Sequence, residues 1–180
     1  MAEQVKAKKA IKKQFFDVKS DLTHSKLSLY GANVEELAGK VLTIDLSRSL
    51  RGKNLVLKIR TKLDAGTLVG EPVSLNLAGS YVRRMMRTGV DYVEDSFIVE
   101  CKDSKVVVKP FMITRNKVPR SVLNSLRVEA KKFIEGFVKA RILKEVFSEI
   151  MANKIQRELS LKLKKIYPLA LCEIRDIELA

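Results

Sequence analysis

The sequence is poor in the residues from which most catalytic and metal sites are built. It has one histidine, two cysteines and no tryptophan among 180 residues. With His24 as the only imidazole, a histidine-based nucleophile, proton shuttle or zinc site lacks its usual ligands. Neither GxxxxGK[ST] nor GxGxxG, the glycine-rich phosphate-binding patterns, is present. We therefore expect no enzyme, no metal and no cofactor.

The sequence also lacks long apolar runs and a cysteine framework. No stretch of about 18 apolar residues is available to cross a membrane, and the lysine-rich N-terminus has no apolar segment of a secretion signal. Cys101 and Cys172 lie among apolar residues in strand-like segments, which favours buried thiols over a disulfide. These features predict a cytoplasmic protein with no membrane contact.

Positive charge is abundant and arrives in clusters without acidic residues. The chain has 35 lysines and arginines against 21 acidic residues, a net charge of +14. The acid-free segments are residues 6–13, 48–53, 83–87 and 109–120. A compact protein carries such a surface most readily beside a polyanion, so nucleic acid is the predicted partner.

The N-terminal residues predict a disordered basic tail. Residues 1–14 hold five lysines, one glutamate and no aromatic residue, and this composition cannot offset the entropy of ordering. Phe15 to Val18 supplies the first apolar anchor, and a polar stretch follows to Glu36. We predict one α+β RNA-binding domain over residues 15–180.

Two segments in the first half alternate with a period of two. Residues 40–46 and 54–63 are predicted strands, joined by a basic loop over 47–53 with Gly52 at the turn. In the second strand, one face carries Leu55, Leu57, Ile59 and Leu63, and the other carries the basic stripe Lys58, Arg60 and Lys62.

Four more strands are predicted, over residues 72–77, 96–101, 105–114 and 169–179. Residues 102–104 form a short hairpin turn between two of them, and Pro110, which has no N–H to donate, predicts a sheet edge or a bulge. The apolar residues of the last strand shift phase near Arg175, which predicts a bulge there. This strand pairs with one formed much earlier in the chain.

Helical spacing is found once between the strands and throughout the second half. Over residues 80–88, Val82, Met85 and Met86 are predicted to face the core, with Arg83, Arg84 and Arg87 exposed, before Gly89 ends the helix. Pro119 suits a first helical turn. Three apolar stripes follow, with Asn153 in the position of a cap: Val122 to Phe137, Ile142 to Met151, and Ile155 to Ile166. The predicted fold is a mostly antiparallel sheet, barrel-like if its edges pair, with helices packed on it in the C-terminal half.

Arginine dominates the acid-free loops, and its planar fork matches phosphate oxygens better than an ammonium does. Lys131, Lys132 and residues 162–165 have glutamates 129, 135 and 158 nearby, so we interpret them as solvated surface. Tyr81 and Tyr92 are expected to pack on the sheet in preference to stacking on bases. The predicted RNA-binding residues are Lys6, Lys8, Lys9, Lys12, Lys13, Arg48, Arg51, Lys53, Lys58, Arg60, Lys62, Arg83, Arg84, Arg87, Lys109, Arg115, Lys117 and Arg120.

The order of these features resembles one family of ribosomal proteins. The lysine-rich tail, residues 15–19 (FFDVK), 37–41 (LAGKV), the strand over 58–63, the hairpin at 101–105, residues 109–117 (KPFMITRNK) and 166–169 (IYPL) together resemble the archaeal and eukaryotic small-subunit S3Ae family. The resemblance covers about Phe15 to Leu179. The end of the chain at Ala180 is similar to the shorter, archaeal form.

The resemblance implies a structural constituent of the small ribosomal subunit, bound to ribosomal RNA on the platform near the messenger exit. Its partners would be that RNA, neighbouring small-subunit proteins and, where it reaches the exit, messenger RNA, without an obligate homo-oligomer. One alternative is a free-standing RNA- or DNA-binding regulator, and another is a nucleic-acid-processing enzyme using Asp or Glu with a divalent metal. Comigration with intact small subunits at low and high magnesium would separate them.

Overall fold

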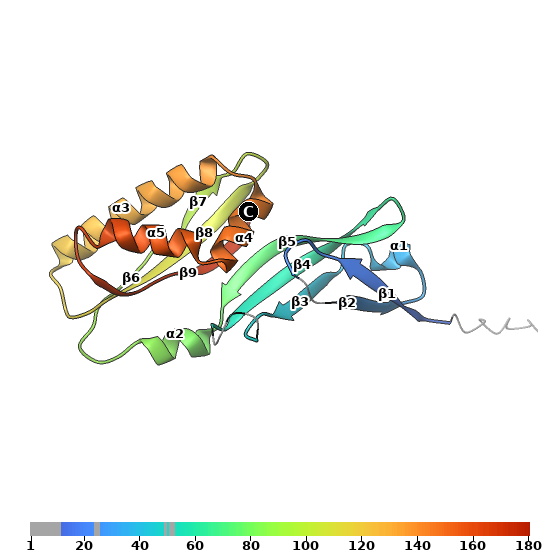
Figure 1. Cartoon of the computed structure of the whole chain (residues 1–180), viewed down its shortest axis with the longest axis horizontal. Helices are drawn as coiled ribbons and strands as arrows, with labels where there is room; N and C mark the ends of the chain where they lie inside the picture. The colour runs from blue at the N-terminus through green and yellow to red at the C-terminus, as the bar shows by residue number, and fades with distance from the viewer. Residues whose placement is uncertain (1–11, 24–25, 49, 51–52) are drawn as a thin grey trace, which may run out of the picture. The chain divides into compact units, whose positions relative to one another are not determined.

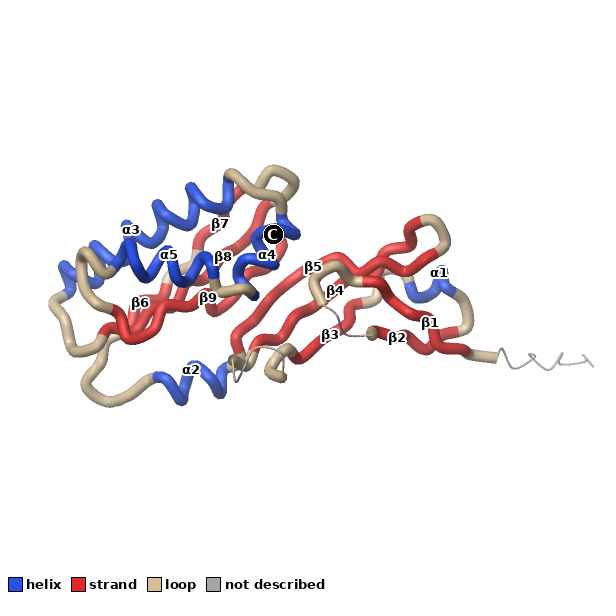
Figure 2. Tube along the Cα trace, in the orientation of Figure 1, coloured by secondary structure: helices blue, strands red, loops and turns tan. Residues whose placement is uncertain are grey.

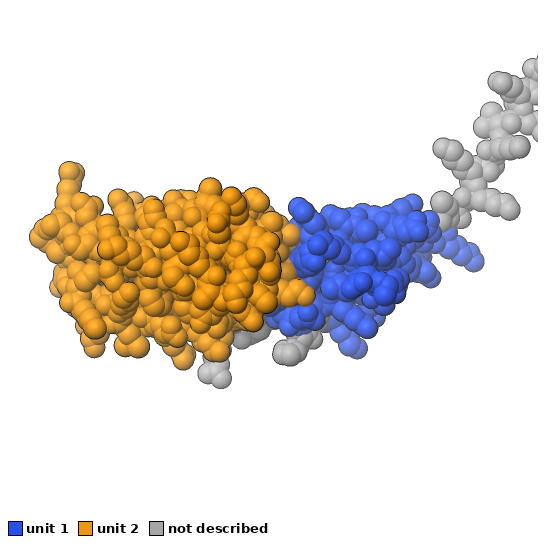
Figure 3. All heavy atoms as spheres, turned by 90° about the horizontal axis from the view of Figure 1, so that it is seen from above, with its two compact units in different colours: residues 1–41, 60–71 blue, residues 42–59, 72–180 orange. Residues whose placement is uncertain are grey.

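The protein is described here by a computed structural model that covers residues 12–23, 26–48, 50 and 53–180 (Figure 1). The chain divides into two compact units, coloured in Figure 3. Unit 1 contains residues 1–41 and 60–71, and unit 2 contains residues 42–59 and 72–180. The long strands β4 (Leu55–Asp64) and β5 (Thr67–Leu77) contribute residues to both units. The division into a tail over 1–14 and one domain over 15–180 stays a prediction.

Unit 1 is built on an antiparallel strand pair. Strand β1 (Gln14–Lys19) pairs with β2 (Leu27–Gly31), and the end of β1 runs parallel to the start of β5. The short helix α1 (Val34–Leu37) places Leu37 against Gly31, where an added Cβ would lie 2.7 Å from Leu37 Cδ2. Strand β2 and most of α1 lie in the stretch to Glu36 that we described as polar and for which we predicted no element. Gln14, predicted in the tail, is the first residue of β1.

The predicted alternation in β4 is confirmed for most of its length. Strand β3 (Val41–Asp45) pairs with β4. Leu55, Leu57 and Ile59 are buried, whereas Lys58, Arg60 and Lys62 are exposed. Alternation keeps Leu63 on the same face, but the burial of that face ends before it, since this side chain is 46% exposed. Thr61 ends the buried face and donates to the carbonyl of Leu37 at 2.5 Å.

Unit 2 is organised around β8 (Lys105–Thr114). It pairs antiparallel with β6 (Tyr92–Glu94), β7 (Phe97–Glu100) and β9 (Leu169–Leu179), and β9 pairs with the end of β5. Lys109 lies opposite Asp176, but Pro110 lies opposite Ile174, so Arg175 is the extra residue of a bulge. Both bulge predictions, at Pro110 and near Arg175, are confirmed. The described strands do not close into a barrel in either unit.

Three helices pack on one face of the unit 2 sheet (Figure 2). They are α3 (Arg120–Lys139), α4 (Leu143–Met151) and α5 (Lys154–Leu163). Each buries the central residues of the apolar stripe that predicted it, whereas Ile142 lies just before α4 and is 41% exposed, and Ile166 lies beyond α5 and is 39% exposed. An α+β fold with a mostly antiparallel sheet and helices in the C-terminal half is thus confirmed. No helix in the described part of the chain is long and apolar enough to cross a membrane.

The helix α2 (Gly79–Met85) buries Tyr81 and Val82. It ends three residues earlier than predicted, and Met86 is consequently outside it. The prediction that Met86 faces the core is wrong, because its side chain is 42% exposed. Met85 lies beside Ile113 of β8, and alternation along β8 puts Ile113 on the sheet face opposite to Val108.

Candidate nucleic-acid interface

Helix α2 presents arginines at its C-terminal end. Arg83 and Arg84 are exposed in its last turn, where positive charge complements the helix dipole. The Arg84 guanidinium lies 5.4 Å from the centroid of the Tyr81 ring, which is itself buried. Burial is the first cause that raises the pKa of Tyr81. The buried Tyr81 ring therefore lies next to the Arg84 guanidinium, and its packing on the sheet in preference to stacking on bases stays a prediction.

Two loops next to α2 are fastened together by Asp91 and Thr114. The Asp91 N–H donates to Thr114 Oγ1 at 3.0 Å, and the Thr114 N–H donates to the Asp91 carbonyl at 2.9 Å. The Asp91 carboxylate accepts the N–H of Val118 at 2.9 Å. Thr114 is fully buried at the end of β8. These bonds hold the loop that follows α2 against the loop that follows β8.

As a result, Arg87 and Arg115 line the same hollow. Its volume is about 390 Å³, and its walls are Met85, Thr88, Val90, Ile113, Ala170 and Leu171. Both arginines are exposed, and neither forms an ion pair with an acidic residue in the described ranges. Two predicted RNA-binding residues that are 28 positions apart in the sequence thus line one hollow, whose other lining residues are mostly apolar.

The basic stripe of β4 is exposed along its length, but its members are not equally available. The Lys62 ammonium lies 2.5 Å from the Glu71 carboxylate in unit 1, with both side chains well exposed. In unit 2, Lys58 is close enough to Glu178 to counter the rise in the pKa of that carboxyl, which comes mainly from its hydrogen bond with Asp176. No ion pair of Arg60 is found within the described ranges.

Lys53, predicted in an exposed basic loop, is buried instead. Its ammonium lies 2.5 Å from Glu173 Oε2, and both side chains are about nine-tenths buried. It also donates to Asn153 Oδ1, so Asn153 uses its side chain for this contact and does not cap α5 with it. Burial raises the pKa of Glu173, although the charge of Lys53 acts in the opposite direction. Lys53 is neutralised within the protein and has no free face for a phosphate.

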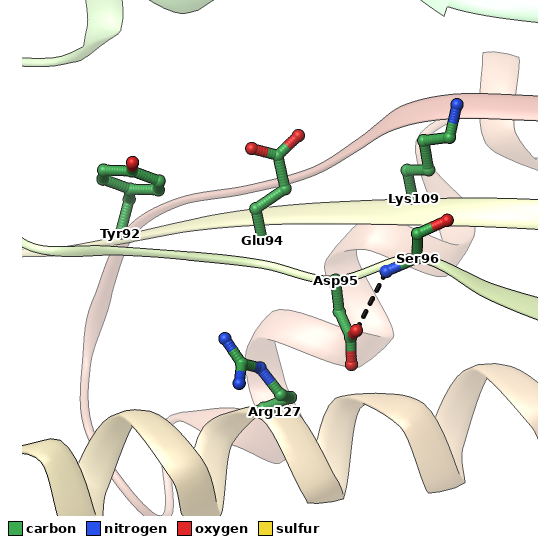
Figure 4. Close-up of a pocket in the computed structure, with 6 residues that line it drawn as sticks. All are labelled: Tyr92, Glu94, Asp95, Ser96, Lys109 and Arg127. Carbon is green, nitrogen blue, oxygen red and sulfur yellow. Dashed lines mark hydrogen bonds between the residues drawn. The ribbon is translucent and has the colours of Figure 1, made fainter.

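Lys109 is likewise engaged, with its ammonium 2.8 Å from Asp176 Oδ2. That hydrogen bond is the main cause that raises the pKa of Lys109. Lys109 lines a groove with Tyr92, Glu94, Asp95, Ser96 and Arg127, shown in Figure 4. Asp95 accepts the Ser96 N–H and Glu94 pairs with Arg175. Two carboxylates make this groove a poor site for phosphate.

The other predicted cations are placed as follows. Lys12, Lys13, Arg48, Lys117 and Arg120 are exposed. Lys6, Lys8, Lys9 and Arg51 lie outside the described residues. Elsewhere in unit 2, Lys131 pairs with Glu135 and Lys162 with Glu129, as the interpretation of a solvated, balanced surface predicts. Among the residues that can be described, no three His, Cys, Asp or Glu side chains are grouped to hold a metal.

A family model described as the Ribosomal S3Ae family matches residues 3–180. The chain belongs to this family. Two similar relatives are both named small ribosomal subunit protein eS1. One, from Nanoarchaeum equitans, is 27% identical over 120 residues, and the match covers 66% of this chain and 61% of the relative. The other, from Methanothermobacter thermautotrophicus, is 29% identical over 133 residues, with 71% and 68% covered.

The S3Ae family chain also exposes two aromatic residues that sequence reasoning did not predict to be exposed. Phe15, predicted as an apolar anchor, is 73% exposed, and its neighbour Phe16 is turned toward the interior. Tyr30 of β2 is 56% exposed and lies directly opposite Phe15. The signal was present, because adjacent residues of a strand point to opposite faces, so only one phenylalanine of the pair can be buried.

Proposed function

We propose that this chain is a structural constituent of the small ribosomal subunit and binds ribosomal RNA. The observation that carries the proposal is the hollow where Arg87 and Arg115 converge, held by Asp91 and Thr114. Family membership and the names of the relatives support the same function. The S3Ae resemblance favours a position on the platform near the messenger exit, in a ribosome-bound, cytoplasmic protein.

The hollow suits a phosphate of an RNA backbone. Two guanidinium groups present planar donors to one anion, and each fork can bind oxygen atoms in pairs. The apolar lining residues Met85, Ile113 and Leu171 offer no polar side-chain group that would compete with a phosphate for the two guanidinium groups. Because A-form RNA hides its bases in a deep, narrow groove, a protein of this kind reads shape and backbone. Catalysis is not required for this role.

Exposed cations that form no ion pair within the described part of the chain extend the interface. Arg83 and Arg84 on α2 lie on the same helix that leads to Arg87. Lys117 and Arg120 follow Arg115 in the segment that leads into α3. We assign the first contacts with RNA to these residues, and exclude Lys53 and Lys109, whose charges are used inside the fold.

Sedimentation of small subunits tests the proposal. The tagged parent chain should comigrate with intact small subunits at both low and high magnesium. The double variant R87Q/R115Q should be depleted from the subunit fraction, because both donors of the hollow are lost. K105Q is the matched control for loss of charge, since Lys105 is exposed and already paired with Glu100 at 2.9 Å.

A parent chain that never comigrates with small subunits would overturn the ribosomal function. If it also binds one RNA or DNA sequence selectively, the free-standing regulator replaces it. Normal comigration of R87Q/R115Q would remove the hollow from the interface while leaving the ribosomal function in place.

A further inference from the structure

An aromatic pair stands on the solvent side of the β1–β2 hairpin in unit 1. Phe15 and Tyr30 are cross-strand neighbours, with ring centroids 4.9 Å apart and an angle of 46° between the ring planes. The side chains on the other face of these strands are turned inward: Val18 is 5% exposed and Gly31 contacts Leu37. The outward face thus combines two rings with Asp17 and Ser28.

Positive charge adjoins the rings. The Lys13 ammonium lies 6.0 Å from the centroid of the Tyr30 ring, which is within the range of a cation–π interaction. Lys12 is also exposed, and both lysines belong to the acid-free lysine cluster of residues 6–13. Flat aromatic faces beside ammonium groups are the combination that binds unpaired nucleotides, with bases on the rings and phosphates on the lysines.

A protein partner fits this surface less well. A stable protein–protein interface buries about 1,200–2,000 Å² in total, and only two rings are offered here among polar neighbours. A strand that added to β2 would contact backbone groups and would not need the rings. A cross-strand aromatic pair adds only modestly to the stability of a hairpin, which does not explain why two large rings are left in water.

We propose that Phe15 and Tyr30 form a stacking platform for one or two unpaired RNA nucleotides, with Lys13 contacting the adjacent phosphate. The proposal rests on RNA binding as the function, and it adds a second kind of contact to the arginine hollow. The rings stack on the flat faces of the bases, which every base has, so the platform should bind without sequence preference and should bind single-stranded RNA more tightly than duplex.

The test compares binding of the full chain to single-stranded oligoadenylate, single-stranded oligouridylate and an RNA hairpin of equal length, each about twelve nucleotides. F15L/Y30L keeps apolar bulk and removes both rings. Its affinity for oligoadenylate should fall about 5- to 150-fold, the equivalent of about 1–3 kcal/mol of stacking. The salt dependence should not change, because neither ring is charged. K13Q should instead flatten the slope of log affinity against log salt by about 0.7.

Y92L is the matched control, because Tyr92 is 51% exposed but stands beside Glu94 and Asp95. It should bind all three RNAs like the parent. Equal affinity of F15L/Y30L and the parent for oligoadenylate would show that the rings are not a stacking platform. If both proteins still bind the RNA hairpin, RNA binding as the proposed function stands. If F15L/Y30L is lost from small subunits but keeps its affinity for oligoadenylate, the rings contact a protein and the platform is also wrong. Circular dichroism melting excludes unfolding of F15L/Y30L as the cause of weaker binding.

Discussion

At the scale of single residues, the buried pair of Lys53 and Glu173 decides a large part of local stability. Both side chains are nearly buried, and the two residues are far apart in the sequence. Removing one partner of such a pair leaves an uncompensated charge, which costs much more than the pair itself contributes. Lys53 is therefore a structural residue, although its sequence context is that of an RNA-binding loop.

We predict that K53M lowers the free energy of unfolding by about 3–5 kcal/mol at neutral pH. Because burial raises the pKa of Glu173, the neutral carboxyl is favoured in the folded state. The stability linked to it is fully present below the carboxyl's unfolded pKa and is lost as pH rises through the raised folded value. Because Lys53 acts against that rise, K53M should raise the pKa of Glu173 further, and the stability deficit of K53M relative to the parent should shrink as the carboxyl is protonated between about pH 8 and about pH 4. Urea unfolding of parent and variant measures it.

A second variant keeps this prediction testable if K53M does not fold. K53M/E173L replaces both charges by apolar side chains and should recover most of the lost stability. A pH-independent deficit in K53M, or a double variant as unstable as the single one, would contradict the role of the buried charge.

The two thiols should differ in reactivity for a related reason. Burial raises the pKa of Cys172 to about 12, whereas Cys101 is only partly buried and its pKa rises less. At about pH 8 the Cys172 thiol is therefore almost entirely protonated, and the thiolate is the form that reacts. Iodoacetamide should label Cys101 in the native chain and Cys172 only after unfolding, as read by peptide mass spectrometry. Equal labelling rates of the native thiols would show that Cys172 is accessible.

At the scale of elements, two glycines should respond in opposite ways to the same substitution. A Cβ on Gly31 would lie 2.7 Å from Leu37 Cδ2, and Leu37 is fully buried. Gly136 is exposed within α3, with nothing within 4 Å of an added Cβ. We expect G31A to destabilise the fold by about 1–3 kcal/mol through overpacking. G136A should stabilise it by about 0.5–1 kcal/mol through helix propensity. Thermal unfolding of both variants checks the signs, and stabilisation by G31A would disprove the close contact.

Local patterns predicted the elements where burial alternates regularly and failed where tertiary contacts decide. The bulge at Arg175 could be predicted because an apolar phase shift is a local signal, and so could the three C-terminal helices. The sequence reasoning missed the short elements β1, β2, α1 and β6, and it treated Phe15 to Val18 as one apolar anchor although Phe15 is exposed and Phe16 takes the inward position. The buried face of β4 ends at the polar residue Thr61, whose hydroxyl donates to the carbonyl of Leu37, and this tertiary contact leaves no local signal in the sequence.

The sequence predicted which arginines belong to the candidate interface, but not how folding brings them together. Acid-free clusters identified Arg87 and Arg115, whereas their convergence depends on bonds between Asp91 and Thr114, which no local pattern indicates. The same holds for neutralisation of Lys53 by Glu173 and of Lys109 by Asp176. Charge that is visible in the sequence is available to a ligand only where folding leaves it unpaired.

At the scale of the whole molecule, the net charge of +14 predicts how RNA binding depends on salt. Each phosphate neutralised by a lysine or arginine releases condensed counterions, so log affinity falls linearly with log salt. About five to eight phosphate contacts give a slope on the order of −4 to −7 for a structured small-subunit RNA. A nearly flat dependence would contradict electrostatic scaffolding and favour a base-reading regulator.

Single-residue variants show which cations contribute to this salt dependence, because the structure distinguishes cations without an acidic partner from those in ion pairs. R87Q and R115Q should each flatten the slope by about 0.9 and weaken cognate and unrelated structured RNAs alike. K109Q removes the same formal charge, but Lys109 already pairs with Asp176 at 2.8 Å, so its slope should stay within about 0.3 of the parent. Titration of both RNAs over a range of salt concentrations, with all three variants, provides the comparison. If K109Q flattens the slope as much as R87Q does, Lys109 exchanges its ion pair with Asp176 for a phosphate contact when RNA binds. Total charge, and not the pairing in the fold, would then govern binding.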